Sequence, residues 1–195
     1  GSADGSRLLC VASITRRKAQ DVLVAALAWA QRPLRCALAG PRRDPEFDAE
    51  LGALIERTGL AGAVSLLGPL AGAELEAAYA AADLAVLVSH AETYGMAVTE
   101  ALARGIPVAV SDAGALPDTL GHAPDGSLPG FVVPAGRPDA LGSALRSWSD
   151  DALLRAALRR SAIARRSILS GWDHTARHLH RVLEGMRRRP AAVSR

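Results

Sequence analysis

Two glutamates and a glycine lie close together in the segment SHAETYGMAVTEALARG. Glu92 and Glu100 are eight positions apart, and Gly95 lies between them. If a helix begins here, the exposed N–H groups of Gly95, Met96 and Ala97 form an anion site, because the first turn of a helix leaves its donors unpaired. Carboxylates bind hydroxyl groups through strong, charge-assisted hydrogen bonds. The segment therefore predicts a site for a ligand with hydroxyl groups and an anionic group, such as a nucleotide sugar.

Lys18 is a candidate for the matching cation. It is the one lysine among 23 basic residues, and the other 22 are arginines. In a chain that uses arginine so consistently, a lysine suggests a specific role, here the neutralisation of a diphosphate. The alternative is a surface charge that flanks a helix. Arg16 and Arg17 lie beside it, and the sequence leaves open which of the two side chains faces the ligand.

The elements that position these residues follow from the hydrophobic pattern. Short apolar stretches of strand length alternate with helical patterns, which favours an α/β fold: a doubly wound parallel sheet of about six strands with helices on both faces, and C-terminal helices appended. The predicted strands cover residues 8–12, 34–39, 64–67, 84–88, 108–110 and 131–133, and the predicted helices cover 20–30, 45–58, 73–82, 96–103, 116–120, 138–148, 151–168 and 173–188.

The strand order decides whether the candidate residues meet. In the order 3-2-1-4-5-6, the order in which successive strands are added to the sheet reverses between the first and fourth strands, and ligands bind at that switch point beyond the carboxyl ends of the strands. The loop after the first strand is 13–19, and the loop after the fourth is 89–95. We therefore expect Lys18 and Glu92 to face each other across one cleft.

The segment 89–108 reads S-x-x-E-x-x-G-x-x-x-x-E-A-x-A-x-G-x-P-V. Together with its E-x7-E pair, it resembles the retaining glycosyltransferases of the two-domain GT-B type, often called group one and similar to family four. The resemblance extends over residues 7–150 as a series of motifs. Those outside the segment lie at 11–23, 39–40, 64–68, 81–88, 112–118 and 130–134.

This resemblance implies a Rossmann-like, donor-binding half of a GT-B enzyme. Glu92 would bind hydroxyls of the transferred sugar and Glu100 would bind the ribose. Lys18, with the backbone N–H groups near Gly95 and Met96, would neutralise the diphosphate. The predicted catalytic residues are therefore Glu92 and Lys18. No metal and no other cofactor is expected, because the N–H groups and the lysine stabilise the leaving group.

Four positions depart from the family pattern. Many members carry an arginine where this chain has Ser13, and Arg17 or Arg16 could replace it. Ala19 replaces a usual glycine, Ala113 replaces the first glycine of a G-G pair, and Asp118 replaces a glutamate. These departures leave an alternative open, a non-catalytic nucleotide-binding or interaction module that has kept the fold.

The chain divides into a tag or linker (1–6), the nucleotide-sugar-binding domain (7–150), C-terminal helices (151–189) and a tail (190–195). Complete family members have about twice this length, in two domains. We therefore expect the N-terminal acceptor-binding domain to be missing and the isolated chain to be inactive. We expect a cytoplasmic location. Association of the full-length parent with an anionic membrane surface is an alternative that the sequence leaves open.

Other functions fit the residues less well. A dinucleotide-binding domain would need G-x-G-x-x-G in the first strand-to-helix turn and an acidic residue after the second strand. His174, His178 and His180 have no acidic or thiol neighbours that would complete a metal site. The Arg-rich region 155–189 contains a single aromatic residue, so no nucleic acid is expected as a partner.

Cys10 and Cys36 lie in apolar strands and are expected to be buried thiols. For His90 we favour a role in the loop over contact with a ligand, and for Tyr94 we favour packing.

Overall fold

A computed structural model describes residues 1–169 of the chain. It contains one parallel six-stranded sheet with the order β3-β2-β1-β4-β5-β6, which confirms the predicted topology. The strands are β1 (Arg7–Val11), β2 (Arg35–Ala39), β3 (Val64–Gly68), β4 (Leu84–Leu87), β5 (Val108–Ser111) and β6 (Gly130–Val133). The helices are η1 (Arg16–Lys18), α1 (Gln20–Ala30), α2 (Pro45–Arg57), α3 (Gly72–Ala81), α4 (Met96–Ala103), α5 (Leu116–Leu120), α6 (Pro138–Asp150) and α7 (Ala152–Arg166).

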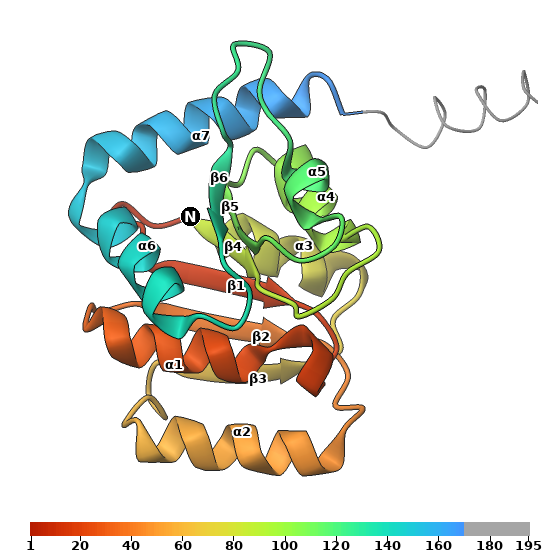
Figure 1. The fold of residues 1–195 in the computed structure, drawn as a ribbon, viewed down its shortest axis with the longest axis vertical. Helices are drawn as coiled ribbons and strands as arrows, with labels where there is room; N and C mark the ends of the chain where they lie inside the picture. The colour runs from red at the N-terminus through yellow and green to blue at the C-terminus, as the bar shows by residue number, and fades with distance from the viewer. Residues whose placement is uncertain (170–195) are drawn as a thin grey trace, which may run out of the picture.

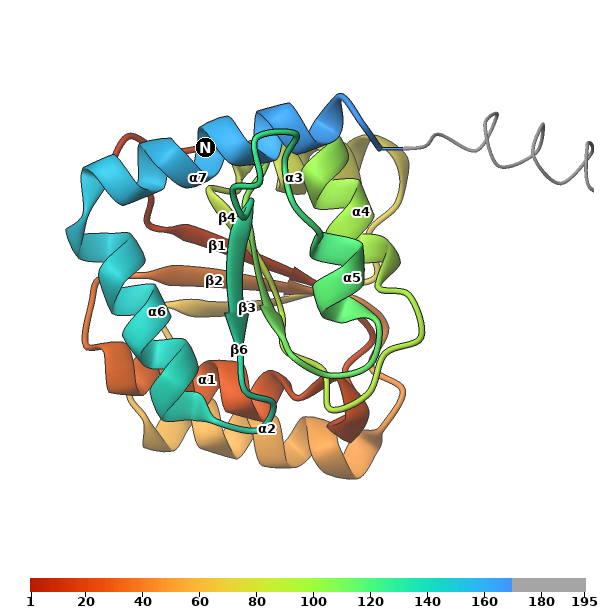
Figure 2. The same cartoon turned by 45° about the horizontal axis from the view of Figure 1, so that its top comes forward.

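Helices cover both faces of the sheet (Figures 1 and 2). On one face α1, α2 and α6 enclose a core to which β1 and β2 contribute, and α1 packs mainly against α6. On the other face α3, α4 and α5 enclose a second core, which α7 completes. The central strand β4 and its neighbour β5 are buried at every position. Their uniformly apolar sequences follow from this burial on two sides.

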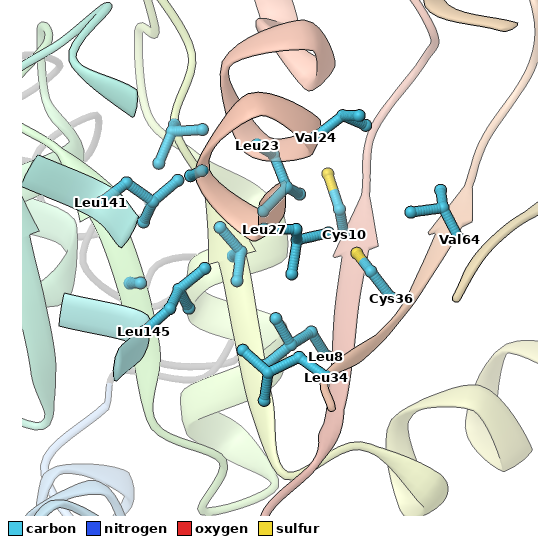
Figure 3. Packing of buried hydrophobic residues seen from close by; sticks show 14 of the residues in the cluster. Leu8, Cys10, Leu23, Val24, Leu27, Leu34, Cys36, Val64, Leu141 and Leu145 are labelled. Carbon is cyan, nitrogen blue, oxygen red and sulfur yellow. The ribbon is translucent and has the colours of Figure 1, made fainter. Parts of the chain in front are cut away.

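Figure 3 shows the first core at close range, with Leu23 of α1 and Leu141 of α6 among the side chains that fill it. Cys10 of β1 and Cys36 of β2 lie in it as buried free thiols, as the sequence predicts. Burial raises the pKa of Cys10 to about 12. A thiol reacts as its thiolate, so this residue is inert at neutral pH.

Helix starts agree with local sequence signals. Asp44 caps α2 by accepting a hydrogen bond from the Phe47 N–H at 3.1 Å, and Pro45 occupies the first helical position. Asp151 caps α7 by accepting from the N–H groups of Leu153 and Leu154 at 2.8 and 2.9 Å. The predicted helix at 173–188, with its three histidines, lies outside the described residues.

The segment 1–6, which the sequence predicts to be a tag or linker, lies against the amino edge of the sheet. Its Ser2 N–H donates to Asp83 Oδ1 at 2.7 Å, and its Gly5 carbonyl accepts from Trp148 Nε1 at 2.7 Å. Asp83 also accepts from the Arg7 N–H at 3.0 Å and pairs with Arg159 at 2.6 Å. The carboxylate of Asp83 therefore joins this segment, β1 and α7 at the edge opposite the candidate site.

Candidate functional site

The loops that follow β1 and β4 meet at the carboxyl edge of the sheet (Figure 1). The His90 N–H donates to the Arg17 carbonyl at 2.9 Å, which joins the two loops through their backbones. Lys18 Nζ forms a short ion pair with Glu92 Oε2. The two side chains are only 13% and 9% exposed. The structure therefore brings together the two residues that the strand order predicts to face each other.

The charge of Lys18 decides the protonation state of Glu92. Burial raises the pKa of the Glu92 carboxyl, but the hydrogen bond and positive charge of Lys18 outweigh that effect. The Thr93 N–H also donates to Glu92, at 3.3 Å, and Arg17 adds a weaker attraction. The net result is a pKa below the usual range, so Glu92 is a carboxylate at neutral pH.

Two glycines shape the loop that carries Glu92. Gly114, in the loop after β5, has a φ of 57°, and a Cβ there would lie 2.1 Å from the Glu92 carbonyl oxygen. That oxygen accepts from the Ala115 N–H at 3.1 Å. Gly95 has a φ of 80°, and a Cβ there would lie 2.7 Å from Leu116 Cδ2. Both positions therefore require glycine for conformation and for space.

Gly95 is the N-cap of α4, the helix that begins four residues after Glu92 at Met96. Within the described part of the chain, the N–H groups of Gly95, Met96 and Ala97 have no hydrogen-bond acceptor. The Met96 residue is 57% exposed, so this end of the helix is open to solvent. The partial positive charge of the helix N-terminus and the free donors can together hold an anion.

Glu100 lies on the second turn of the same helix. Its Oε2 accepts a hydrogen bond from the Tyr79 hydroxyl at 2.9 Å, and it makes no ion pair within residues 1–169. Tyr79 comes from α3 and is 1% exposed. Sequence reasoning missed this partner. The available signal was an isolated tyrosine in an alanine-rich helix, since a buried tyrosine hydroxyl usually requires a polar neighbour.

The structure distinguishes the two arginines that precede Lys18. Arg16 pairs with Glu50 of α2 at 2.9 Å, and its guanidinium lies 5.5 Å from the centre of the Phe47 ring. Arg17 turns toward the other loop, where its Nη1 lies 3.5 Å from the Ala91 carbonyl oxygen. Arg17 is therefore the arginine next to the Lys18–Glu92 pair.

Ala19, one of the departures from the family pattern, has a φ of 54° and is completely buried. This is the left-handed region, which an alanine adopts at a cost of about 1 kcal/mol and a glycine adopts freely. The usual glycine at this position thus has a conformational reason.

His90 is exposed at its loop position, and its imidazole forms no hydrogen bond within the described residues. Tyr94 is 56% exposed, so the expectation that it serves in packing is wrong. The reason is that its loop passes over the outside of α5, where the Tyr94 carbonyl bonds to Thr119.

Other features of the described chain lie away from this site. A cavity of about 530 Å³ opens at the amino edge of the sheet, and Tyr79, Asp83 and Arg104 are among its lining residues, whereas Lys18, Glu92 and Glu100 are not. No group of three or more potential metal-ligating side chains occurs in residues 1–169. None of the helices in that range has the length and apolar character needed to cross a bilayer.

Comparison with known protein families gives a match to the model described as glycosyl transferases group 1, over residues 3–165. Among curated relatives, a D-inositol 3-phosphate glycosyltransferase of Kineococcus radiotolerans is 35% identical over 187 residues, covering 89% of this chain and 43% of the relative. The one from Thermobispora bispora is 35% identical over 192 residues, covering 92% and 43%. The chain thus spans less than half the length of these curated relatives.

Solved structures share the fold. The HepE protein of Anabaena, in complex with UDP and glucose, superposes with a TM-score of 0.84 at 24% identity, covering 94% of this chain and 49% of that one. Sucrose-phosphate synthase from Thermosynechococcus elongatus gives 0.79 at 27% identity, covering 95% and 46%. The C-terminal domain of a group 1 glycosyl transferase from Francisella tularensis gives 0.69 at 23% identity, covering 81% and 83%.

Proposed function

Because this chain belongs to the glycosyl transferases group 1 family, we propose that its described domain binds the nucleotide-sugar donor of a GT-B glycosyltransferase. The complete enzyme would transfer the sugar from that donor to an acceptor, which a second domain would bind. The observation that carries the proposal is the Lys18–Glu92 ion pair at the switch point of the sheet, beside the open N-terminus of α4.

The site offers one partner for each part of such a donor. Lys18 and the N–H groups of Met96 and Ala97 would hold the diphosphate, with Arg17 close by. Glu92 would accept hydrogen bonds from the sugar hydroxyls, and Glu100 would accept them from the ribose. In the structure Lys18 and Glu92 satisfy each other. A bound donor supplies a phosphate to the first and hydroxyls to the second, so neither charge would be left without a partner.

The same groups would promote the reaction. When the bond between the anomeric carbon and the phosphate oxygen breaks, negative charge accumulates on the departing nucleoside diphosphate. The ammonium of Lys18 and the N–H groups of α4 stabilise charge at that place and are already oriented before the reaction. We therefore propose transfer without a metal ion and, from the resemblance to the family, retention of configuration at the anomeric carbon.

Two comparisons support the nucleotide sugar as ligand. The Anabaena neighbour was solved with UDP and glucose, and the curated relatives are named glycosyltransferases. These names favour an enzyme over a non-catalytic module. The chain spans less than half of the length of those relatives, so the transfer of sugar to an acceptor is proposed for the whole protein. For the isolated domain we expect binding of a donor and little or no transfer of sugar.

Titration calorimetry with UDP, GDP and ADP and with their glucose conjugates tests the proposal. We expect one nucleotide to bind, and Lys18→Ala to weaken its binding at least tenfold, since a charge-assisted contact contributes roughly 1.5–3 kcal/mol. Arg16→Ala is the matched control, because it removes a neighbouring positive charge that faces α2. Absence of binding by all six ligands at millimolar concentration, or equal losses in the two variants, would contradict the proposed site.

A further inference from the structure

We propose that Tyr79 is a positioning residue for Glu100. Its buried hydroxyl holds one oxygen of the Glu100 carboxylate and leaves the other free to accept from a ribose hydroxyl. The inference rests on the proposed function, in which Glu100 binds the ribose. It adds to that function a residue from another helix, outside the segment with the two glutamates.

The geometry places a donor behind Glu100. The Tyr79 hydroxyl lies 2.9 Å from Glu100 Oε2, and Glu100 Oε1 has no hydrogen-bond partner within residues 1–169. Tyr79 is 1% exposed, whereas Glu100 is only partly buried. One oxygen of the carboxylate is therefore engaged from the interior, and the other is available to a ligand.

Arg104 contacts the Tyr79 ring and the backbone of Glu100. Its guanidinium lies 4.3 Å from the centre of the Tyr79 ring, and its Nη1 donates to the Glu100 carbonyl at 2.7 Å. Arg104 is in turn held by Glu76 of α3, whose carboxylate accepts from Nε at 3.1 Å. These contacts link α3 to α4 and place the Arg104 guanidinium against the Tyr79 ring.

This arrangement reduces the freedom of a flexible side chain. A glutamate has several rotatable bonds, and ordering it when a ligand arrives costs part of the binding free energy. A buried donor that selects one orientation beforehand avoids that loss. Burial and the neighbouring carboxylate both raise the pKa of Tyr79, so the phenol keeps its proton and remains a donor throughout the neutral range.

Tyr79→Phe separates positioning from packing, because it keeps the ring and the Arg104 contact and removes only the hydroxyl. We would titrate the full chain with UDP, GDP and ADP and with their 2′-deoxy forms. For the nucleotide that binds, we expect the ribose form to bind wild type more tightly than the deoxy form. Tyr79→Phe should weaken the ribose form by about tenfold, as expected for one hydrogen bond to a charged group, and change the deoxy form little.

Two reference variants make the result decisive. Glu100→Ala should abolish the preference for ribose. Ile55→Val is a conservative change in α2 that costs about 1 kcal/mol of stability away from the site, and it should leave the preference intact. If Tyr79→Phe keeps the full preference while Glu100→Ala loses it, the positioning role is wrong and the proposed function stands. If Ile55→Val reduces the preference equally, the effect is one of general stability and the inference fails. If wild type binds no nucleotide, the proposed function fails and this inference fails with it.

Discussion

Lys18 and Glu92 are 74 positions apart in the sequence, yet they form an ion pair in which both side chains are largely buried. The pair exists because β1 and β4 are neighbours in the sheet, so the loops at their carboxyl ends lie side by side. Each residue thus occupies the charged group of the other. A ligand that binds one of them must compete with the other, and several consequences can be measured.

Glu92→Gln should separate binding of the diphosphate from binding of the sugar. The change removes a negative charge beside the phosphate site and releases Lys18, so nucleoside diphosphates should bind at least as tightly as they do to wild type. The glutamine accepts weaker hydrogen bonds than a carboxylate, so any additional affinity of the sugar-bearing nucleotide should fall by about tenfold. Calorimetry with UDP and UDP-glucose, or with the other nucleotide that binds, measures both. Weaker binding of the diphosphate itself would show that Glu92 does not compete for Lys18.

The pH dependence of stability should report the same pair. In wild type the pKa of Glu92 is lowered, so its contribution to stability is present above the pKa of an unfolded glutamate, about 4.3, and is lost as the pH falls through the folded value. In Lys18→Met the burial of Glu92 is no longer offset and its pKa should be raised. That variant should lose stability as the pH rises above about 4.3.

The difference in unfolding free energy between wild type and Lys18→Met should therefore grow from pH 3 to pH 7, to about 1–3 kcal/mol. Urea unfolding at several pH values measures it. Lys18→Met combined with Glu92→Gln should show a much smaller dependence on pH. A constant difference across this range would mean that Lys18 does not stabilise the charged form of Glu92.

Gly114→Ala should disturb the loop that holds Glu92. A Cβ at this position would lie 2.1 Å from the Glu92 carbonyl oxygen, so the backbone must shift, and a φ of 57° adds strain. We expect a loss of about 2–3 kcal/mol in thermal or urea unfolding, together with weaker nucleotide binding. Gly126→Ala is the matched control, because its φ of 81° brings the same strain with no atom within 4 Å of the added carbon. Equal losses in the two variants would rule out a role for the close approach to Glu92.

Ala19→Gly should change stability by no more than about 1 kcal/mol. It relieves the left-handed strain of the alanine, about 1 kcal/mol, but it removes a buried methyl group worth about 0.8 kcal/mol and increases the freedom of the unfolded chain. Gln31→Gly is the comparison, because Gln31 also has a positive φ, 52°, at the end of α1 and is exposed. It should be the more favourable of the two changes in urea unfolding. A clear stabilisation by Ala19→Gly would mean that the methyl group contributes no packing.

The sequence was sufficient to predict the order of the elements and the proximity of Lys18 and Glu92 in the candidate site. Uniformly apolar strands such as 84–88, separated by helical patterns, predict a parallel sheet, and the right-handed connections of such sheets leave few possible strand orders. From the order 3-2-1-4-5-6 the proximity of Lys18 and Glu92 follows. These features are local patterns or consequences of chain topology, and both can be inferred from the sequence without coordinates.

The directions of individual side chains required the three-dimensional packing. Arg16 and Arg17 are adjacent and chemically identical, but one turns to Glu50 on α2 and the other to the loop after β4. The contact between Tyr79 and Glu100 joins two helices, and the exposure of Tyr94 depends on how its loop passes α5. Such contacts depend on rotamers and on distances of a few ångströms between elements. Residue type and spacing do not contain that information, because it arises only when the helices pack on the sheet.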